Sequence, residues 1–230
     1  MAAKSLFKSL FSTTIGRKIV MALSGLFLVS FVIVHLIGNL SLLVSAEVFN
    51  TYTHKLESLG PLLYVIELIL LAGFVCHFTL AIIITFKNWK ARGDKYKTLK
   101  SAGDPSKQTI SSKTMIYTGA IILIFTVIHI KTFKYGTYYE TTLAGETVRD
   151  LHRLVIEVFQ NLGYVVFYSA VMILLGFHLR HGFWSAFQSL GANHPRYSAF
   201  IYTTGILIAF IIAIGFLLIP ILIYINGGAL

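Results

Sequence analysis

Five long apolar segments make up most of this 230-residue chain and constrain its fold more than any other feature. They cover residues 19–44, 62–86, 114–134, 158–180 and 199–225. Each segment is long enough to cross a hydrocarbon core of about 30 Å at about 1.5 Å per residue. A composition that is 56% hydrophobic and 12% charged is also typical of a membrane protein. We therefore predict an all-α integral membrane bundle of five transmembrane helices, with residues 1–230 forming a single domain.

The distribution of basic residues predicts how the bundle is oriented. With a cytoplasmic N-terminus, fourteen of the 19 Lys and Arg residues fall in inner segments. The outer segments then hold Lys55, Lys131, Lys134, Arg149 and Arg153. Because basic residues favour the cytoplasmic side, we expect the C-terminus outside and a multi-pass protein of the cell inner (cytoplasmic) membrane.

The formal net charge of +10 is largely explained by this topology, so no nucleic acid partner is expected. Eight of the inner basic residues lie in the segment 87–113. This segment has two open explanations. It sets the topology and contacts anionic lipid, or it forms a docking surface for a cytoplasmic partner.

Four histidines lie inside apolar segments, where an ionisable side chain is costly and usually functional. They are His35, His77, His129 and His178. His35 and His129 lie roughly 24–25 Å from the inner boundary, along outward-running helices. His77 lies roughly 15 Å from Lys87, at the inner end of an inward-running helix. The inner end of the fourth segment is ambiguous, because Arg180 can snorkel while the helix continues through Trp184, and His178 lies roughly 9 Å from Trp184. The spacing predicts an outer and an inner layer of two histidines each, separated by roughly 10–15 Å.

Two imidazoles at one depth, each from a different helix, match the two axial positions of a haem iron. A zinc site would normally gather three or four ligands at one point. Filling both axial positions leaves no open site for O₂ and favours electron transfer. Because the chain has no Cys-x-x-Cys-His motif, we expect two noncovalently bound b haems. His35 and His129 would bind the outer haem iron, and His77 and His178 the inner one.

Two Ser/Thr-Gly pairs share their spacing to a histidine, in the pattern [Ser/Thr]-Gly-x9-His. Ser24-Gly25 precedes His35, and Thr118-Gly119 precedes His129. Eleven residues are about three turns, so each hydroxyl lies on the face of its histidine, one layer deeper. We expect these four residues to face the inner haem, with the glycines leaving room for the macrocycle. Ordinary small-residue packing between membrane helices is the alternative.

Glu67 precedes His77 by ten residues and therefore lies roughly 15 Å further out, at the outer layer. A carboxylate there is a candidate for the proton exchange that accompanies quinone chemistry. A boundary glutamate near the outer headgroups is the alternative. His54 and Glu57, in the loop before Pro61, are further candidates for the same quinone site. For most of the remaining histidines, His152, His181 and His194, we expect surface or interfacial solvation.

In these features the chain resembles the di-haem cytochrome b membrane-anchor subunit of succinate:quinone oxidoreductases, the succinate dehydrogenases and fumarate reductases, in its five-helix single-anchor form. The resemblance extends over nearly the whole chain. The stretches that carry it are MALSGLF at 21–27, HLIGN at 35–39, the loop 49–61, Ile66-Glu67 with His77, then His129, and HLRHGFWS at 178–185. Together, four ligand histidines in order on four helices are more specific than any single stretch.

The resemblance implies that the chain is the electron-transfer and quinone-reacting subunit of a succinate dehydrogenase complex. It would carry electrons between an iron–sulfur subunit and a membrane quinone, with menaquinone expected. A flavoprotein subunit and the iron–sulfur subunit would dock on the basic cytoplasmic face. Some quinol-oxidising fumarate reductases carry a glutamate two residues before the fourth ligand. Gly176 at that position favours succinate oxidation and leaves fumarate reduction as the alternative.

Two other classes of protein stay open. A different di-haem b cytochrome would dock its partner on the outer face, where the sequence carries few basic residues. A transporter with proton-relay histidines would have broken helices, often in paired repeats. Pro220 is the only proline well inside a predicted span, near its end, so the sequence gives no sign of broken helices.

Overall fold

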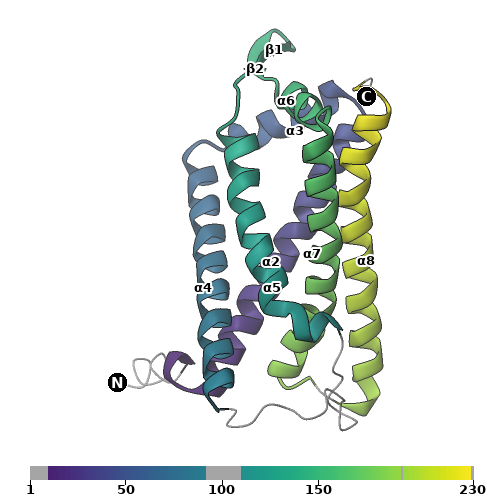
Figure 1. The fold of residues 1–230 in the computed structure, drawn as a ribbon. Coiled ribbons are helices and arrows are strands. Elements are labelled where there is room, and N and C mark those ends of the chain that lie inside the picture. Colours follow the sequence, from purple (N-terminus) through teal and green to yellow (C-terminus); the bar gives the residue numbers. More distant parts are fainter. Residues whose placement is uncertain (1–9, 92–109, 193, 229–230) are drawn as a thin grey trace.

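Five long helices form the body of the molecule (Figure 1). The computed structural model describes residues 10–91, 110–192 and 194–228. Within them, the long helices are α2 (Thr14–Leu40), α4 (Pro61–Ala91), α5 (Ile110–His129), α7 (Leu162–Ser189) and α8 (Pro195–Ile225). All five are long and apolar enough to cross a membrane. The prediction of an all-α bundle with five long apolar helices is confirmed.

Four of the long helices form a ring in the order α2, α4, α5, α7, and each packs against the next. The fifth helix, α8, lies outside the ring along α7 and also touches α2 (Figure 1). The buried apolar core lies mainly among α2, α7 and α8 and includes Leu36, Ile212 and Ile219. By contrast, α4 buries only Leu80 and touches α5 little. The backbones of the diagonal pairs, α2 with α5 and α4 with α7, hardly touch.

The ends of the long helices depend on single polar side chains. Helix α2 begins at Thr14, before the predicted start at 19, because Thr13 Oγ1 accepts a hydrogen bond from the Gly16 N–H at 3.0 Å. Helix α7 begins after Asn161, whose Oδ1 accepts from the Gly163 N–H at 2.8 Å. It continues to Ser189, past the predicted end at 180, and Arg180 inside it donates to the Tyr202 hydroxyl of α8 at 3.1 Å.

Two short helices and a β-hairpin close the end of the bundle that holds the C-terminus (Figure 1). They are α3 (Ala46–Glu57), α6 (Leu151–Phe159) and the antiparallel strands β1 (Glu140–Leu143) and β2 (Glu146–Arg149). Buried Asn50 joins them, because its amide donates to Asp150 Oδ1 at 2.7 Å and its oxygen accepts from the His152 N–H at 3.0 Å. We call this assembly the outer cap.

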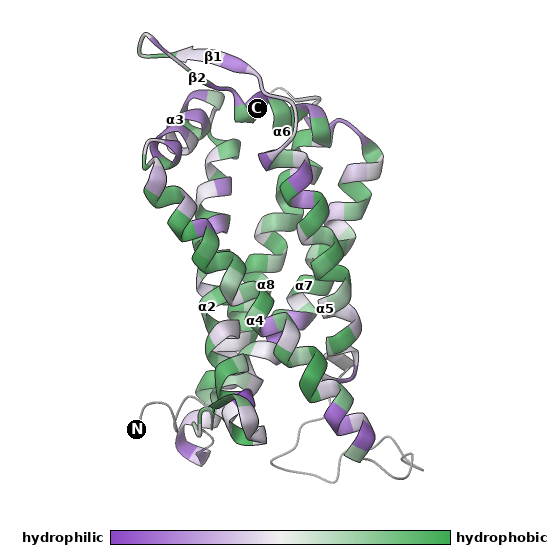
Figure 2. Cartoon of the chain, turned by 90° about the vertical axis from the view of Figure 1, so that its left-hand side faces the viewer, coloured by the Kyte–Doolittle hydropathy of each residue, from purple (hydrophilic) through white to green (hydrophobic). Residues whose placement is uncertain are grey.

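Polar residues concentrate at the two ends of the bundle and in the hairpin, with an apolar body between them (Figure 2). Basic residues mark the end opposite the outer cap, among them Arg17, Lys18, Lys87 and Lys90. Residues 92–109, most of the predicted cytoplasmic loop, lie outside the described residues. The orientation of the bundle stays a prediction, and the words inner and outer follow it for the two ends of the bundle.

Candidate functional site

The outer histidines meet across the bundle. His35 on α2 and His129 on α5 have ring centroids 5.8 Å apart and perpendicular planes, at 90°. Each ring is stacked by the phenylalanine one turn earlier on its own helix. Phe31 lies 5.4 Å from His35 at 17°, and Phe125 lies 5.5 Å from His129 at 28°. The rings thus bridge a diagonal of the ring of helices across which the backbones hardly touch.

The nitrogens of this outer pair are poorly satisfied by protein groups. Within the described part of the chain, the buried Nδ1 of His129 has no hydrogen-bond partner. The amide nitrogen of Asn39 lies 3.4 Å from both ring nitrogens of His35, but its short bond, at 2.8 Å, goes to the His35 carbonyl oxygen. Because a buried polar atom without a partner is costly, the outer pair is suited to an additional ligand.

The inner histidines are instead held at Nδ1 by the neighbouring helices. His77 Nδ1 on α4 lies 3.3 Å from Ser24 Oγ and 3.2 Å from the Met21 carbonyl oxygen, both on α2. His178 Nδ1 on α7 lies 3.0 Å from Thr118 Oγ1 on α5. The inner pair therefore belongs to the second diagonal, α4 with α7.

The paired glycines leave room for these inner rings. A Cβ added to Gly25 would lie 3.0 Å from His77 Cε1, and one added to Gly119 would lie 3.4 Å from His178 Cε1. The space beside each glycine, where room for a macrocycle is expected, is therefore bordered by an imidazole. Ser24 and Thr118 likewise contact the inner histidines directly.

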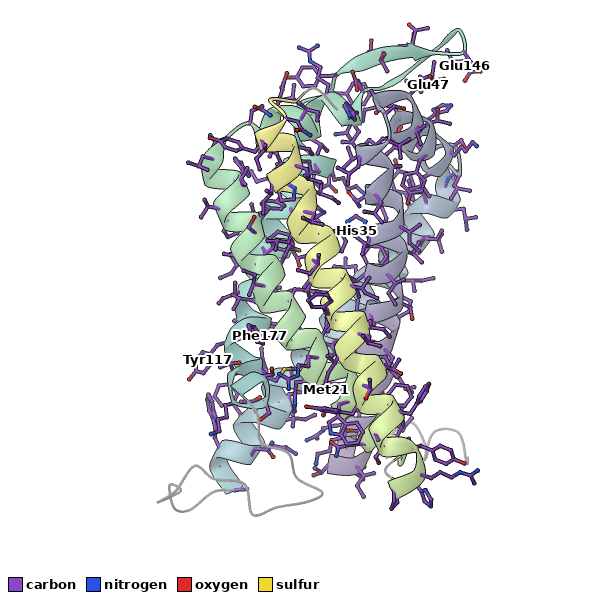
Figure 3. The ribbon with its side chains drawn as sticks, turned by 90° about the vertical axis from the view of Figure 1, so that its right-hand side faces the viewer. Met21, His35, Glu47, Tyr117, Glu146 and Phe177 are labelled. Atoms are coloured by element: carbon purple, nitrogen blue, oxygen red, sulfur yellow. The ribbon has the colours of Figure 1, made fainter. Side chains whose placement is uncertain are left out.

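The two tiers are well separated along the bundle. Ser24 marks the inner tier on α2 and His35 the outer tier, and eleven residues of helix span about 16 Å. Thr118 and His129 give the same separation on α5. Figure 3 shows Met21 near the inner end and His35 nearer the outer cap.

The donor set of the outer tier fits two imidazole ligands on one haem iron. Two imidazoles that share one metal ion have centroids about 6 Å apart, because each metal–nitrogen bond is about 2 Å. The observed 5.8 Å between His35 and His129 is close to this distance. No group of three or more His, Cys, Asp and Glu side chains among the described residues is arranged to hold a metal ion. The arrangement therefore favours two ligands per tier over a zinc cluster.

Glu67, the main quinone-site candidate, forms an ion pair with Lys134 of the π-helical turn η2 (Ile130–Lys134). This turn follows His129 directly, and π-helical turns are frequent at functional sites. The ammonium also lies 6.0 Å from the ring centroid of Tyr64, one turn before Glu67 on α4. Glu67 and Lys134 are both partly exposed at the surface of the bundle, with side-chain exposures of 35% and 38%.

The structure gives the other two quinone-site candidates different surroundings. His54 Nε2 lies 3.5 Å from Glu146 Oε2 of the hairpin. Glu57, at the end of α3, is exposed, and its side chain makes no hydrogen bond or ion pair within the described residues. No contact among the described residues joins either of them to Glu67.

Several residues that contact the histidines or Glu67 were not predicted from the sequence. Phe31 and Phe125 stand four residues before their histidines, a signal that the sequence does contain. Lys134 was assigned only to topology. The expectation of solvation is wrong for His152, which is 6% exposed and belongs to α6. His194 caps α8, since its Nδ1 accepts from the Arg196 N–H at 3.2 Å.

Comparisons of the chain with protein-family models, with curated proteins and with solved structures give no significant match.

Proposed function

We propose that this chain is a di-haem b cytochrome that anchors a succinate dehydrogenase complex in the cell inner membrane. It carries electrons between an iron–sulfur subunit and a membrane quinone, with menaquinone as the expected species. His35 and His129 hold the outer haem iron, and His77 and His178 hold the inner one. The proposal joins the family resemblance of the sequence to the geometry of the four histidines.

One observation carries the proposal: the outer pair of histidine rings meets between two helices whose backbones hardly touch. Ordinary packing of aromatic rings would account for the contact itself. It would not account for two histidines placed together among apolar side chains, where an ionisable ring is costly and usually functional. The engaged Nδ1 atoms of the inner pair add support, because metal-bound histidines commonly have their other ring nitrogen hydrogen-bonded.

Haem iron with two imidazole ligands supplies one-electron transfer without an open position for O₂. The protein itself positions the ligand histidines and shields the two tiers from water. Phe31 and Phe125 stack against the outer ligands and fix their ring planes. Ser24 and Thr118 hold the inner ligands. The apolar body of the bundle keeps water away from both tiers (Figure 2).

Glu67 and Lys134 form the proposed quinone-reacting site at the outer tier. Quinone reduction and quinol oxidation require protons, and a carboxylate paired with an ammonium can accept or release them. The partial exposure of the pair supports this role, because a quinone reaches the protein through the lipid. His54 and Glu57 are weaker candidates, since His54 already pairs with Glu146.

The direction of the reaction is proposed from Gly176. A Cβ added there would lie 2.9 Å from Ala213 Cβ of α8, so a glutamate could be accommodated only if α7 and α8 moved apart. The close packing of α7 and α8 therefore leaves no room for a proton-returning carboxylate at that position. Succinate oxidation is therefore the proposed direction, and quinol:fumarate reduction by the same subunit is the alternative.

The test is redox-titrated absorption spectroscopy of the purified full chain, with haem counted as the pyridine haemochrome. We expect two b haems per chain. Each substitution His35→Ala, His77→Ala, His129→Ala and His178→Ala should remove one haem or both, and retention of two haems in any variant refutes that ligand. A preparation without a Soret band from haem-replete cells rejects the proposal and favours a histidine-relay transporter.

A further inference from the structure

The contacts of His77 determine which of its ring nitrogens carries the proton. The Met21 carbonyl oxygen, 3.2 Å from Nδ1, can only accept a hydrogen bond. The single hydroxyl proton of Ser24 is directed to the same carbonyl, at 3.0 Å, which leaves a lone pair of Oγ for the ring nitrogen at 3.3 Å. Both neighbours of Nδ1 are therefore acceptors. Nδ1 carries the proton, and Nε2 of the neutral ring carries the lone pair.

The same accounting applies to His178 on the other half of the bundle. The Thr118 hydroxyl donates to the carbonyl oxygens of Thr114 and Met115, each at 3.1 Å. Its oxygen then accepts from His178 Nδ1 at 3.0 Å. Among the described residues, Thr118 Oγ1 is the sole hydrogen-bond partner of that nitrogen. His178, too, presents the lone pair of Nε2.

Ser24 on α2 and Thr118 on α5 thus present equivalent hydroxyl groups to the inner tier. The shared pattern is Met-x2-[Ser/Thr]-Gly-x5-Phe-x3-His, beginning at Met21 on α2 and at Met115 on α5. The outer tier has no matching acceptor, since the buried Nδ1 of His129 has no partner within the described residues. The hydroxyl contacts are therefore specific to the inner tier of the described structure.

We propose that Ser24 and Thr118 are positioning residues that fix the Nδ1–H tautomer of His77 and His178 and direct Nε2 to the inner haem iron. This inference rests on the proposed function, because it assigns roles toward a haem. A hydrogen bond from Nδ1–H to oxygen makes the imidazole a more basic ligand, which stabilises the oxidised iron. The two hydroxyls therefore lower the reduction potential of the inner haem.

The experiment replaces each hydroxyl in the full chain and measures the midpoint potential and the low-spin ferric EPR signal of both haems. Thr118→Val and Ser24→Ala remove the hydroxyl with little change of shape. We expect the inner potential to become more positive and its EPR g values to shift, while the outer haem is unchanged. The shift should be larger for Thr118→Val, because His77 keeps the Met21 carbonyl as a second acceptor.

Two kinds of control distinguish the effect of losing the hydrogen bond from the effect of changed side-chain packing. Thr118→Ser and Ser24→Thr keep the hydroxyl and should keep the unmodified potential. Thr126→Val and Ser30→Ala remove hydroxyls that donate to carbonyls of their own helices, Ile122 and Leu26, and should leave the inner haem unchanged. The inner haem is assigned by its absence in His77→Ala.

Every outcome bears on the inference. Loss of the inner haem in Thr118→Val with retention in Thr118→Ser also supports it, because the hydroxyl is then required. An unchanged inner potential in both hydroxyl-free variants, or equal changes in the hydroxyl-retaining ones, overturns the positioning role and leaves the di-haem function intact. If the unmodified full chain binds no haem, the proposed function itself is rejected.

Discussion

Gly25 and Gly119 stand at matching places on α2 and α5, yet the structure leaves them unequal room. An added Cβ would lie 3.0 Å from the ring of His77 but 3.4 Å from that of His178, an ordinary contact distance. Overpacking costs about 1–3 kcal/mol, and alanine contributes about 0.5–1 kcal/mol over glycine in a helix. We therefore expect Gly25→Ala to destabilise the protein and Gly119→Ala to be neutral or stabilising.

Thermal unfolding of the two variants in detergent, with haem content measured in parallel, checks this difference. Gly60→Ala is unsuitable as a control, because Gly60 has a φ of +55° that disfavours a side chain. Gly182→Ala is suitable, since the nearest atom to its added Cβ is the terminal methyl of Met115 at 4.0 Å. Equal losses of stability in Gly25→Ala and Gly119→Ala would contradict the closer approach of the His77 ring to Gly25.

Glu67 tests the quinone-reacting part of the proposal. Glu67→Gln removes the ion pair with Lys134 and the ability to exchange a proton, at almost constant volume. We expect a slower reaction with a soluble quinone analogue, by at least the roughly 10²-fold typical of a lost general acid or base, with two haems retained. Glu47→Gln, at an exposed outer glutamate of α3, is the matched control. Quinone kinetics equal to those of the unmodified protein would reject the role of Glu67.

At the scale of elements, the spans were predictable from the sequence and their ends were not. An uninterrupted apolar run predicts a helix because backbone groups in hydrocarbon must bond within the segment. Arg180 shows why the end of such a run is uncertain. By charge it marked the end of the fourth segment, but its hydrogen bond to Tyr202 on a neighbouring helix keeps it inside α7. That partner cannot be identified from local composition.

The outer cap illustrates a second limit of the sequence. Ala144 and Gly145 form the hairpin turn with φ of 50° and 87°, and neither is marked by an apolar pattern. Asn50 joins α3 to α6 across 100 residues of chain, so nothing local to either helix indicates the contact. The histidine layers were predictable because helical rise converts spacing into depth. The pairing of Glu67 with Lys134 was not, since it depends on the turn η2.

His152 makes the outer cap sensitive to acid. Burial lowers the pKa of His152 below its ordinary value of 6.5, and within the described residues its Nε2 has no hydrogen-bond partner. Below about pH 6.5 the unfolded cap therefore binds more protons than the folded one, so the stability of the cap falls as the pH is lowered. As the pH rises well above 6.5, the ring becomes neutral in both states and its effect disappears.

Hydrogen–deuterium exchange of α6 and the hairpin, corrected for intrinsic rates, measures this effect. We expect protection to decrease between pH 7 and pH 5 in the unmodified protein. His152→Gln removes the titrating ring and should make protection independent of pH over that range. A pH dependence of the same size in this variant would show that another group controls the cap.

At the scale of the whole molecule, the helices that carry the two tiers of histidines are unequally packed. The packed core lies among α2, α7 and α8, whereas α4 carries His77 and Glu67 on a helix with a single buried residue. Helix α4 packs against α2 but touches α5 little, so a further constraint would stabilise its position. In the proposed function that constraint is the bond from His77 to the inner haem, so His77→Ala should increase proteolysis of the α3–α4 turn more than His35→Ala does.

The orientation of the bundle is the prediction on which the docking of soluble partners depends. Ser58 lies in the exposed turn between α3 and α4, and Ala91 is the exposed last residue of α4. The positive-inside rule places Ser58 outside and Ala91 in the cytoplasm. After Cys76→Ser removes the one native thiol, Ser58→Cys should react with a membrane-impermeant maleimide on intact cells. Ala91→Cys should react only after permeabilisation, and the reverse pattern would place the proposed dehydrogenase subunits on the wrong side of the membrane.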